Sequence, residues 1–287
     1  MSPVPQFFAE YQARVDVELR RLVPAGDGRV EQSMAYTLLA PSKRVRPVLT
    51  LLSAQLCGGT VSRALPAACA MEIVHASSLI LDDLPSMDDS PLRRGRPANH
   101  REFGEAIAIL AAFGLLNLAF GAIAREYEPP LAASLAGLLS TAIGVEGLIG
   151  GQSADLLATE QQITFEMLER IHRRKTGALF NASATAGART AGASSSQLAG
   201  LSAFAKNLGL AFQIVDDLLD VEGDPAETGK AIRADARKTT FVSFSGVAGA
   251  RQLAMELCQT ADRALAPFGR RADRLRALSA FVAGRSL

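Results

Sequence analysis

The sequence predicts an all-α protein built as one domain. Apolar residues recur at spacings of three and four along almost the whole chain, as in Phe7, Tyr11, Val15, Leu19 and Leu22. No run of alternating β-branched residues indicates a strand. The 287 residues show no shift in composition and no repeat of fixed period, which argues against a solenoid. We therefore expect a single domain over residues 1–287.

Clusters of Gly, Pro, Asp and Ser divide this helical pattern into segments. The predicted breaks are 25–28, 40–42, 57–60, 85–97, 128–130, 192–196 and 223–230. They imply about ten helices, none of them separated by a long linker.

Residues 106–124 carry no charge and are long enough to span a membrane. They are rich in Ala and Gly, include Asn117 and lack flanking aromatic belts and basic clusters. A second apolar stretch, 131–151, follows with Glu146 as its one charge. We expect 106–124 to be a central helix, apolar on all sides, and expect no transmembrane segment.

Composition excludes several classes of function. The 30 basic and 29 acidic residues nearly cancel, so the basic excess of a nucleic-acid-binding protein is missing. The three cysteines, Cys57, Cys69 and Cys258, are widely spaced in apolar patterns, which disfavours a disulfide framework or a zinc site. Residues 1–10 do not resemble a signal peptide. We expect a cytoplasmic protein.

A first cluster of carboxylates follows a long apolar segment. Pro85 makes Asp82 and Asp83 the end of the preceding helix, and Asp88 follows in the turn. Each carboxylate at a helix C-terminus is disfavoured by ~0.3–1 kcal/mol. Mg²⁺ prefers such oxygens and shares its remaining positions with water and substrate phosphate. The sequence favours a metal site here over a solvated acidic turn.

A second cluster lies inside an apolar run. Asp216 and Asp220 are four residues apart and share a helix face, with Asp217 between them. Like charges at this spacing repel, and burial adds a desolvation cost, so a bound cation is expected. Two such clusters facing each other would clamp a diphosphate through bridging metals.

The spacing of the two motifs, Asp82-Asp83-x4-Asp88 and Asp216-Asp217-x2-Asp220, resembles that of the trans-prenyl diphosphate synthases. Other segments that carry this resemblance are Lys43-Arg-Val-Arg46-Pro47, Arg93-Arg94-Gly, Gly151-Gln152-x-x-Asp155-Leu156, Lys175-Thr176-Gly177-Ala-Leu-Phe180 and Gly229-Lys230. The first motif, Leu81 before it, and Lys238-Thr-Thr240-Phe after Asp235 look most like bacterial geranylgeranyl diphosphate synthases of carotenoid pathways.

The resemblance implies the isoprenoid synthase fold, a bundle of about ten or more antiparallel helices around a central cavity with both motifs at its mouth. It implies a homodimer, and small-molecule diphosphates as substrates. It also implies three Mg²⁺ ions per active site as cofactor. The implied metal ligands are Asp82, Asp83, Asp88 and Asp216, and the implied catalytic residues are Asp82, Asp88, Asp216 and Lys175.

The resemblance also assigns substrate contacts. Those to isopentenyl diphosphate are Lys43, Arg46, His75 and Arg94. Those to the allylic diphosphate and the departing diphosphate are Arg93, Lys175, Thr176, Gln213 and Lys230. These contacts have structural alternatives. Lys43, Arg44 and Arg46 could form a solvated charge run, and His75 could be a core residue. Arg93 and Arg94 could be surface residues.

Departures from the family pattern limit what is carried over. Ser42 stands where the family has glycine, and Ala112-Phe113-Gly114 replaces a common Gly-Asp-Ala. Gln152 and Asp155 suit helix–helix hydrogen bonding nearly as well as substrate contact. The role of Lys238 stays open.

Product length depends on the residues before the first motif. Ser78 and Ser77, four and five residues before Asp82, lie about 6–7.5 Å along the helix axis, where the growing tail would run. Farnesyl synthases that resemble this chain carry an aromatic floor there. Two small residues therefore predict geranylgeranyl diphosphate, although close helix packing is an alternative role for both serines.

Three other activities are alternatives to this one. A farnesyl synthase differs only in product length and is the main alternative. A class I terpene cyclase normally lacks the second aspartate motif and the residues for a homoallylic diphosphate. A non-catalytic partner subunit should have lost one of the two clusters.

Overall fold

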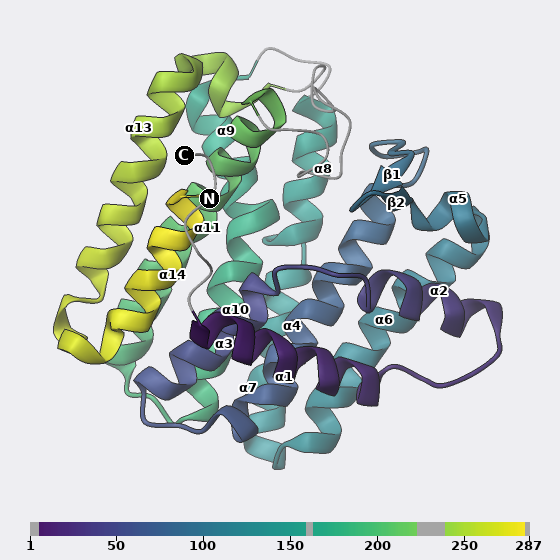
Figure 1. Ribbon diagram of the computed structural model, residues 1–287, viewed down its shortest axis with the longest axis horizontal. Helices are drawn as coiled ribbons and strands as arrows, with labels where there is room; N and C mark the ends of the chain where they lie inside the picture. Colours follow the sequence, from purple (N-terminus) through teal and green to yellow (C-terminus); the bar gives the residue numbers. More distant parts are fainter. Residues whose placement is uncertain (1–5, 159–162, 223–238, 285–287) are drawn as a thin grey trace.

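The computed structural model describes residues 6–158, 163–222 and 239–284. The all-α prediction is confirmed (Figure 1): long helices pack around α3, α4 and α10. The helices are α1 (Gln6–Leu22), α2 (Arg29–Leu38), α3 (Val45–Leu56), α4 (Val61–Asp82), α5 (Asn99–Phe103), α6 (Glu105–Glu126), α7 (Pro129–Ile143), α8 (Leu148–Ala158), α9 (Phe165–His172), α10 (Ala178–Thr190), α11 (Ser195–Glu222), α13 (Phe241–Ala264) and α14 (Asp273–Ala283). A π-helical turn, η1 (Arg173–Gly177), joins α9 to α10, and a 3₁₀ helix, η2 (Ala266–Ala272), precedes α14.

Five predicted breaks, 25–28, 40–42, 57–60, 85–97 and 128–130, fall at or between helix ends. The break at 192–196 overlaps the first residues of α11, and 223–230 lies outside the described residues. Residues 131–151, expected as one apolar stretch, are divided between α7 and α8. Glycine enables this close turn, because a Cβ on Gly147 would lie 2.1 Å from the Ala142 carbonyl oxygen.

A small hairpin interrupts the helical pattern where no strand was expected. Strands β1 (Leu92–Arg93) and β2 (Arg96–Pro97) pair antiparallel. Arg94 and Gly95 connect them with positive φ angles of 55° and 73°, the conformation that tight two-residue hairpin turns require. Two-residue strands are too short to show an alternating pattern, which explains why they could not be predicted.

The central helices pack through small residues. Helix α4 is buried along most of its length, and α10 lies against α3. The closest approach is at Gly187, where a Cβ would stand 2.0 Å from the carbonyl oxygen of Thr50. Glycine therefore sets the distance between α3 and α10.

Helix α4 contains Pro66, which cannot continue the regular ladder of helical hydrogen bonds. The Tyr127 hydroxyl lies at this point, accepting from Ala67 N–H (3.0 Å) and donating to the Arg63 carbonyl (2.7 Å). These are the two groups that a regular helix would pair directly. Tyr127 thus satisfies the backbone groups that the proline region leaves open.

The expectation that residues 106–124 form a helix enclosed on all sides was wrong. One face of helix α6 packs on α4, whereas Ile109, Leu110 and Phe113 are exposed. Exposed Val145 and Ile149 lie near the start of α8. Helix α6 and the start of α8 therefore border an apolar surface rather than filling the centre.

By length and composition alone, four described stretches could cross a membrane: Val61–Asp82, Glu105–Glu126, Pro129–Ala158 and Ser195–Glu222. The first is mostly buried inside the protein, whereas the window in Pro129–Ala158 is only 22% buried. The absence of a transmembrane segment stays a prediction.

Candidate active site

The first aspartate motif lies where α4 ends and the chain turns back (Figure 1). Asp82 is the last residue of α4, and its carbonyl accepts a hydrogen bond from the Asp88 N–H at 3.0 Å. Both carboxylates are partly buried. The turn therefore returns Asp88 to the helix end, next to Asp82.

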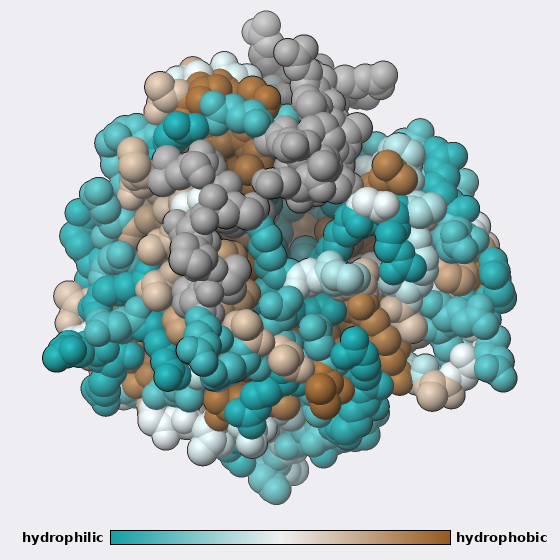
Figure 2. Space-filling model, viewed as in Figure 1, coloured by the Kyte–Doolittle hydropathy of each residue, from teal (hydrophilic) through white to brown (hydrophobic). Residues whose placement is uncertain are grey.

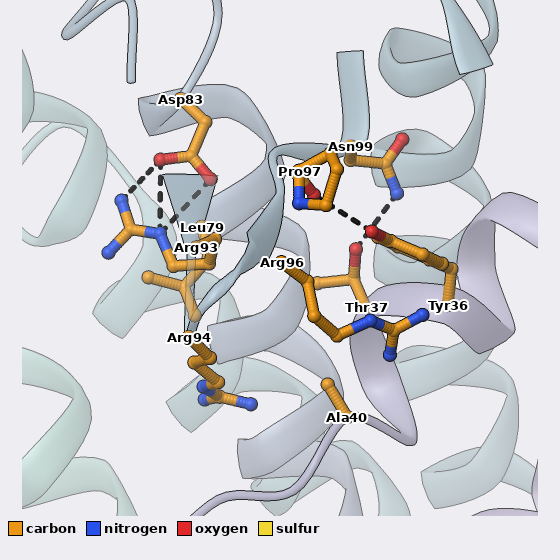
Figure 3. A pocket seen from close by; sticks show the side chains of 10 residues that line it. All are labelled: Tyr36, Thr37, Ala40, Leu79, Asp83, Arg93, Arg94, Arg96, Pro97 and Asn99. Atoms are coloured by element: carbon orange, nitrogen blue, oxygen red, sulfur yellow. Dashed lines mark hydrogen bonds and ion pairs between the residues drawn. The ribbon is translucent and has the colours of Figure 1, made fainter. Parts of the chain in front are cut away.

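Asp83 differs from its two neighbours. Its side chain is 2% exposed, and both of its oxygens accept hydrogen bonds from the Arg93 guanidinium (Figure 3). Charge-assisted forks of this kind fix geometry strongly. Asp83 holds the hairpin against α4, which favours Asp82 and Asp88 over Asp83 as metal ligands.

The surroundings of Asp82 suit a cation. Burial raises its pKa to about 6; Asp88 and Asp83 add to the rise, whereas Lys175 and Arg93 oppose it. Among the described residues, no three His, Cys, Asp or Glu side chains form a complete metal site. A magnesium ion would therefore draw further ligands from water and a bound diphosphate, as Mg²⁺ sites commonly do. The donor set fits magnesium on these terms.

The π-helical turn η1 carries Lys175 and Thr176 toward the motifs. Lys175 Nζ lies 2.6 Å from Asp155 Oδ2 on α8. Helix α8 approaches this turn closely because residue 151 is glycine: a Cβ there would lie 2.3 Å from the Lys175 amide nitrogen. Asp155, whose role the sequence left open, thus orients Lys175. The positive charge of this lysine opposes the rise in the pKa of Asp82.

The second motif is linked to the same turn. The Thr176 hydroxyl donates to Gln213 Oε1 (2.8 Å), and Gln213 Nε2 donates to Asp217 (3.0 Å). The other Asp217 oxygen accepts from the Phe241 backbone N–H at 3.0 Å. Asp217 therefore orders the start of α13, and Asp216, half-buried on α11, lies next to this chain of hydrogen bonds.

The residues expected to hold isopentenyl diphosphate come from separate elements. Arg46, in the first turn of α3, stacks on Phe180 at 4.8 Å and lies 5.8 Å from the Phe212 ring centre. Lys43 is exposed just before α3, with Nζ 6.0 Å from the Phe281 ring centre. Lys230, the last of the predicted contacts, lies outside the described residues.

His75, on α4, is surrounded by positive charge. Burial lowers its pKa well below the ordinary value, and Arg46, Arg94, Arg93 and Arg44 lower it further. The imidazole is therefore neutral in the free protein, and a bound diphosphate would offset the arginines and favour its protonation.

This environment predicts a pH dependence of stability. The unfolded chain takes up a proton at His75 below about pH 6.5 while the folded chain does not, so stability falls as pH drops. Stability should therefore fall between pH 7.5 and 5.5 by on the order of 1 kcal/mol, or about 2 °C in melting temperature for a chain of this length. His75→Gln should lose that much less over this range in thermal melts of the ligand-free protein. Parallel curves for the two proteins would contradict the assignment.

A pocket beside Asp83 gathers arginines from the hairpin (Figure 3). Arg96 stacks 3.9 Å from the ring centre of Tyr36 on α2. Asn99 donates to the Thr37 hydroxyl at 2.8 Å and fixes α5 to α2. The residues lining the pocket are Tyr36, Thr37, Ala40, Leu79, Asp83, Arg93, Arg94, Arg96, Pro97 and Asn99.

Two residues near the site, Arg44 and Glu72, were not singled out from the sequence. Arg44, grouped with a solvated charge run, is buried instead, paired with Glu72. Gln152 is also buried, and its Nε2 lies 3.9 Å from the Met87 sulfur in the turn of the first motif. The signal available in the sequence for the Arg44–Glu72 pair was Glu72, an acidic residue inside the apolar run that forms α4.

The two serines before the motif differ in their surroundings. The Ser77 hydroxyl donates to the Ala112 carbonyl on α6 at 2.8 Å and is buried. Ser78 is half-buried and bonds its own helix at the His75 carbonyl, 2.9 Å away. A larger side chain at Ser77 would enter the contact between α4 and α6.

Comparison with known proteins finds a matching family and related enzymes. The family model for Polyprenyl synthetase matches residues 27–262. A farnesyl diphosphate synthase of Geobacillus stearothermophilus is 42% identical over 257 residues, covering 87% of this chain and 86% of that enzyme. A geranylgeranyl diphosphate synthase of Cyanophora paradoxa is 38% identical over 287 residues, covering 98% and 96%. A crystal structure of a Helicobacter pylori geranyltransferase complexed with magnesium and isoprenyl diphosphate matches with a TM-score of 0.88 at 27% identity, covering 98% and 99%.

The isoprenoid synthase fold and its site of paired carboxylates and cations define a trans-prenyltransferase of isoprenoid biosynthesis. The length of the family match and the sequence identity to both relatives also show the family. The chain belongs to the polyprenyl synthetase family.

Proposed function

We propose that this protein makes geranylgeranyl diphosphate by joining isopentenyl diphosphate to allylic diphosphates. The observation that carries the proposal is the pair of small residues, Ser77 and Ser78, on the turn of α4 that precedes Asp82. The relative from Cyanophora paradoxa supports the twenty-carbon product, and the relative from Geobacillus stearothermophilus supports farnesyl diphosphate as the alternative.

Magnesium is the proposed cofactor, with three ions held by Asp82, Asp88 and Asp216, while Asp83 contributes through Arg93. When bound, these ions supply Lewis-acid and electrostatic stabilisation of charge on the leaving diphosphate. The solved relative from Helicobacter pylori was obtained with magnesium.

The chain's own residues have three proposed tasks. Lys175, oriented by Asp155, together with Arg93, Thr176 and Lys230, binds the departing diphosphate. Gln213 orients Thr176. Lys175 and Thr176 are already held by Asp155 and Gln213 in the ligand-free chain, so little reorganisation of these two groups is required when charge develops.

The second task is to hold the homoallylic diphosphate. Lys43, Arg46, His75 and Arg94 would bind it so that its double bond reaches the allylic carbon. The proton lost after bond formation passes to the released diphosphate. Guanidinium forks suit diphosphate oxygens, and the rings of Phe180 and Phe212 orient Arg46.

The third task is to keep water from the allylic cation. Figure 2 shows the surface hollowed near the centre of the view, with hydrophobic residues inside the hollow. The apolar residues of α4 would line the path of the tail.

Homodimerisation is the proposed assembly, in the cytoplasm. Phe113 is 63% exposed, and it lies on α6 with exposed Leu110 and Ile109. An apolar surface on this face is typical of a protein–protein contact. The surface supports a second copy of the chain as its cover.

The test is direct. Purified protein is incubated with Mg²⁺, isopentenyl diphosphate and each allylic diphosphate in turn, and products are sized by chromatography and mass spectrometry. Twenty-carbon product is expected, with none when a chelator replaces the metal. A main product of fifteen carbons would establish the farnesyl alternative, and no product from any starter would overturn the prenyl-transfer proposal.

Bulk at Ser77 should shorten the product. Ser77→Phe places a ring between α4 and α6, beside the path of the tail, and we expect farnesyl diphosphate as main product with magnesium dependence retained. Ser77→Ala removes the hydrogen bond to Ala112 without adding bulk, and should keep the wild-type product. Product sizing of both variants checks the prediction. Twenty-carbon product from a folded Ser77→Phe enzyme would assign both serines to packing alone.

A further inference from the structure

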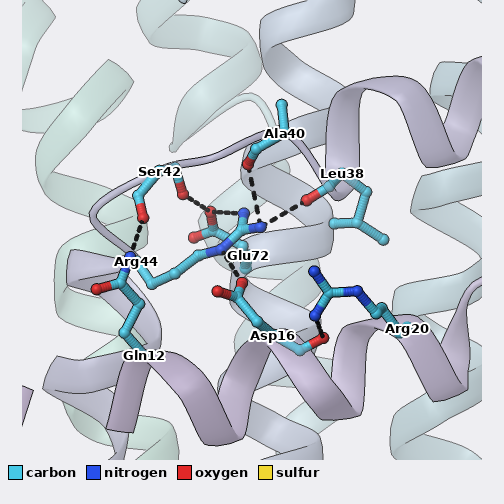
Figure 4. Close-up of polar contacts among 8 residues, drawn as sticks. All are labelled: Gln12, Asp16, Arg20, Leu38, Ala40, Ser42, Arg44 and Glu72. Carbon is cyan, nitrogen blue, oxygen red and sulfur yellow. Dashed lines mark hydrogen bonds and ion pairs between the residues drawn. The ribbon is translucent and has the colours of Figure 1, made fainter. Parts of the chain in front are cut away.

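Arg44 lies in the sequence between two proposed diphosphate-binding residues, Lys43 and Arg46, and its guanidinium is directed toward Asp16 and Glu72 (Figure 4). Its side chain is buried, 2% exposed. Nε donates to Asp16 at 2.9 Å, and one terminal nitrogen donates to Glu72 at 2.8 Å. The other terminal nitrogen donates to the carbonyls of Leu38 (2.9 Å) and Ala40 (3.2 Å).

These bonds tie three helices to the segment that joins α2 to α3. Asp16 comes from α1 and Glu72 from α4, while the two carbonyls belong to the end of α2 and the residues after it. Ser42 strengthens the same connection: its hydroxyl donates to Glu72 (3.2 Å), and its carbonyl accepts from Gln12 (2.7 Å) (Figure 4). Polar contacts with residues of α1 and α4 thus hold segment 39–44 in place.

The backbone at Arg44 is left-handed, with φ 48° and ψ 38°, immediately before α3. A residue with a Cβ rarely adopts this conformation unless surrounding contacts impose it. Here the network supplies those contacts. The turn sends Arg44 toward α1 and α4, while Lys43 lies near Phe281 and Arg46 over Phe180.

We propose that Arg44, clamped by Asp16 and Glu72, is a positioning residue that sets Lys43 and Arg46 in place for the homoallylic diphosphate. The inference rests on the proposed function, because it assumes that these two cations bind that substrate. It assigns Arg44 no contact with substrate. Its effect passes through the shape of segment 39–44.

Only a guanidinium can make this set of bonds. Its planar fork places donors toward two carboxylates and two carbonyls at once, whereas an ammonium is a point charge on a flexible stem. Arg44→Lys keeps the charge beside Glu72 and should leave the segment less firmly held. A small misplacement of binding groups weakens substrate binding strongly.

The first experiment is steady-state kinetics on Arg44→Lys. We expect the KM for isopentenyl diphosphate to rise about 10-fold or more, with kcat and the KM for the allylic diphosphate changed less than about 3-fold. Tyr127→Phe is the matched control: it removes buried hydrogen bonds of α4 that do not involve segment 39–44, and should lower the melting temperature without changing either KM.

The second experiment separates position from stability. In the double variant Arg44→Met with Glu72→Met, no unpaired buried charge remains, so the melting temperature should fall less than in Arg44→Met alone. The KM for isopentenyl diphosphate should nevertheless stay raised, because the carbonyls of Leu38 and Ala40 lose their donors. Recovery of both quantities, or unchanged KM values in Arg44→Lys, would overturn the positioning role. Failure of the proposed function would appear differently, as absence of prenyl transfer in the wild-type enzyme.

Discussion

Asp82→Asn should abolish condensation while the protein stays folded. Removing one of few carboxylates available to magnesium costs electrostatic stabilisation at the leaving diphosphate, and we expect kcat to fall about 1000-fold or more. The change also removes a buried charge whose pKa is already raised to about 6 by its surroundings. The melting temperature without ligand should therefore be unchanged or slightly higher. Single-turnover kinetics and thermal melts measure both quantities.

Asp89→Asn is the matched control for this change. Asp89 lies in the same turn, is exposed, and pairs with Arg101 at the surface. Its φ of 44° is left-handed, which asparagine tolerates as well as aspartate does. The control removes the same charge and should retain activity within about 3-fold, since exposed ion pairs contribute little. Wild-type turnover in Asp82→Asn, or equal losses in both variants, would reject Asp82 as a specific metal ligand.

Gly187→Ala should be strongly destabilising. The added Cβ would stand 2.0 Å from the Thr50 carbonyl oxygen and 3.1 Å from the Ala54 nitrogen, both backbone atoms that cannot move alone. Helices α3 and α10 would have to separate, and α3 carries Arg46. Overpacking of this kind costs up to about 3 kcal/mol, which lowers the melting temperature of a chain of this length by roughly 5 °C. Thermal or chemical unfolding measures the loss.

Gly137→Ala provides the comparison, because it makes the same substitution inside another helix. Gly137 lies on α7, and an added methyl group there would have no neighbouring atom within 4 Å, so it meets open space. Alanine should stabilise this helix by about 0.5–1 kcal/mol through its better helix propensity. A Gly187→Ala protein as stable as Gly137→Ala would show that α3 and α10 pack less tightly than the structure indicates.

The fold class was accessible from the sequence because apolar spacing records which face of a helix is buried. The same signal cannot say what covers that face. Residues 106–124 were expected to be enclosed, yet Phe113 and Leu110 are exposed on α6. Spacing and composition are alike for an enclosed helix and for one that borders an apolar surface of the single chain.

The sequence predicted which residues form the site but not which role each of them has. Adjacent aspartates read alike in sequence, whereas in the structure Lys175 lowers the pKa of Asp82 and Arg93 pairs with Asp83. Likewise Lys43, Arg44 and Arg46 form one charged run, and only the left-handed backbone at Arg44 separates their directions. Side-chain direction at helix ends depends on backbone angles that a residue type does not specify.

The π-helical turn that carries Lys175 makes the loss or gain of a residue different from a substitution in its effect. Such a turn holds one residue more than an α-helical turn, and each residue advances a helix by about 100°. Helices α9 and α10 are therefore out of phase by one residue across Arg173–Gly177. Exchanging amino acids within this turn preserves that phase, but losing or gaining a single codon rotates one helix against the other. The number of residues in the turn therefore fixes where Lys175 and Thr176 lie relative to α8 and α11.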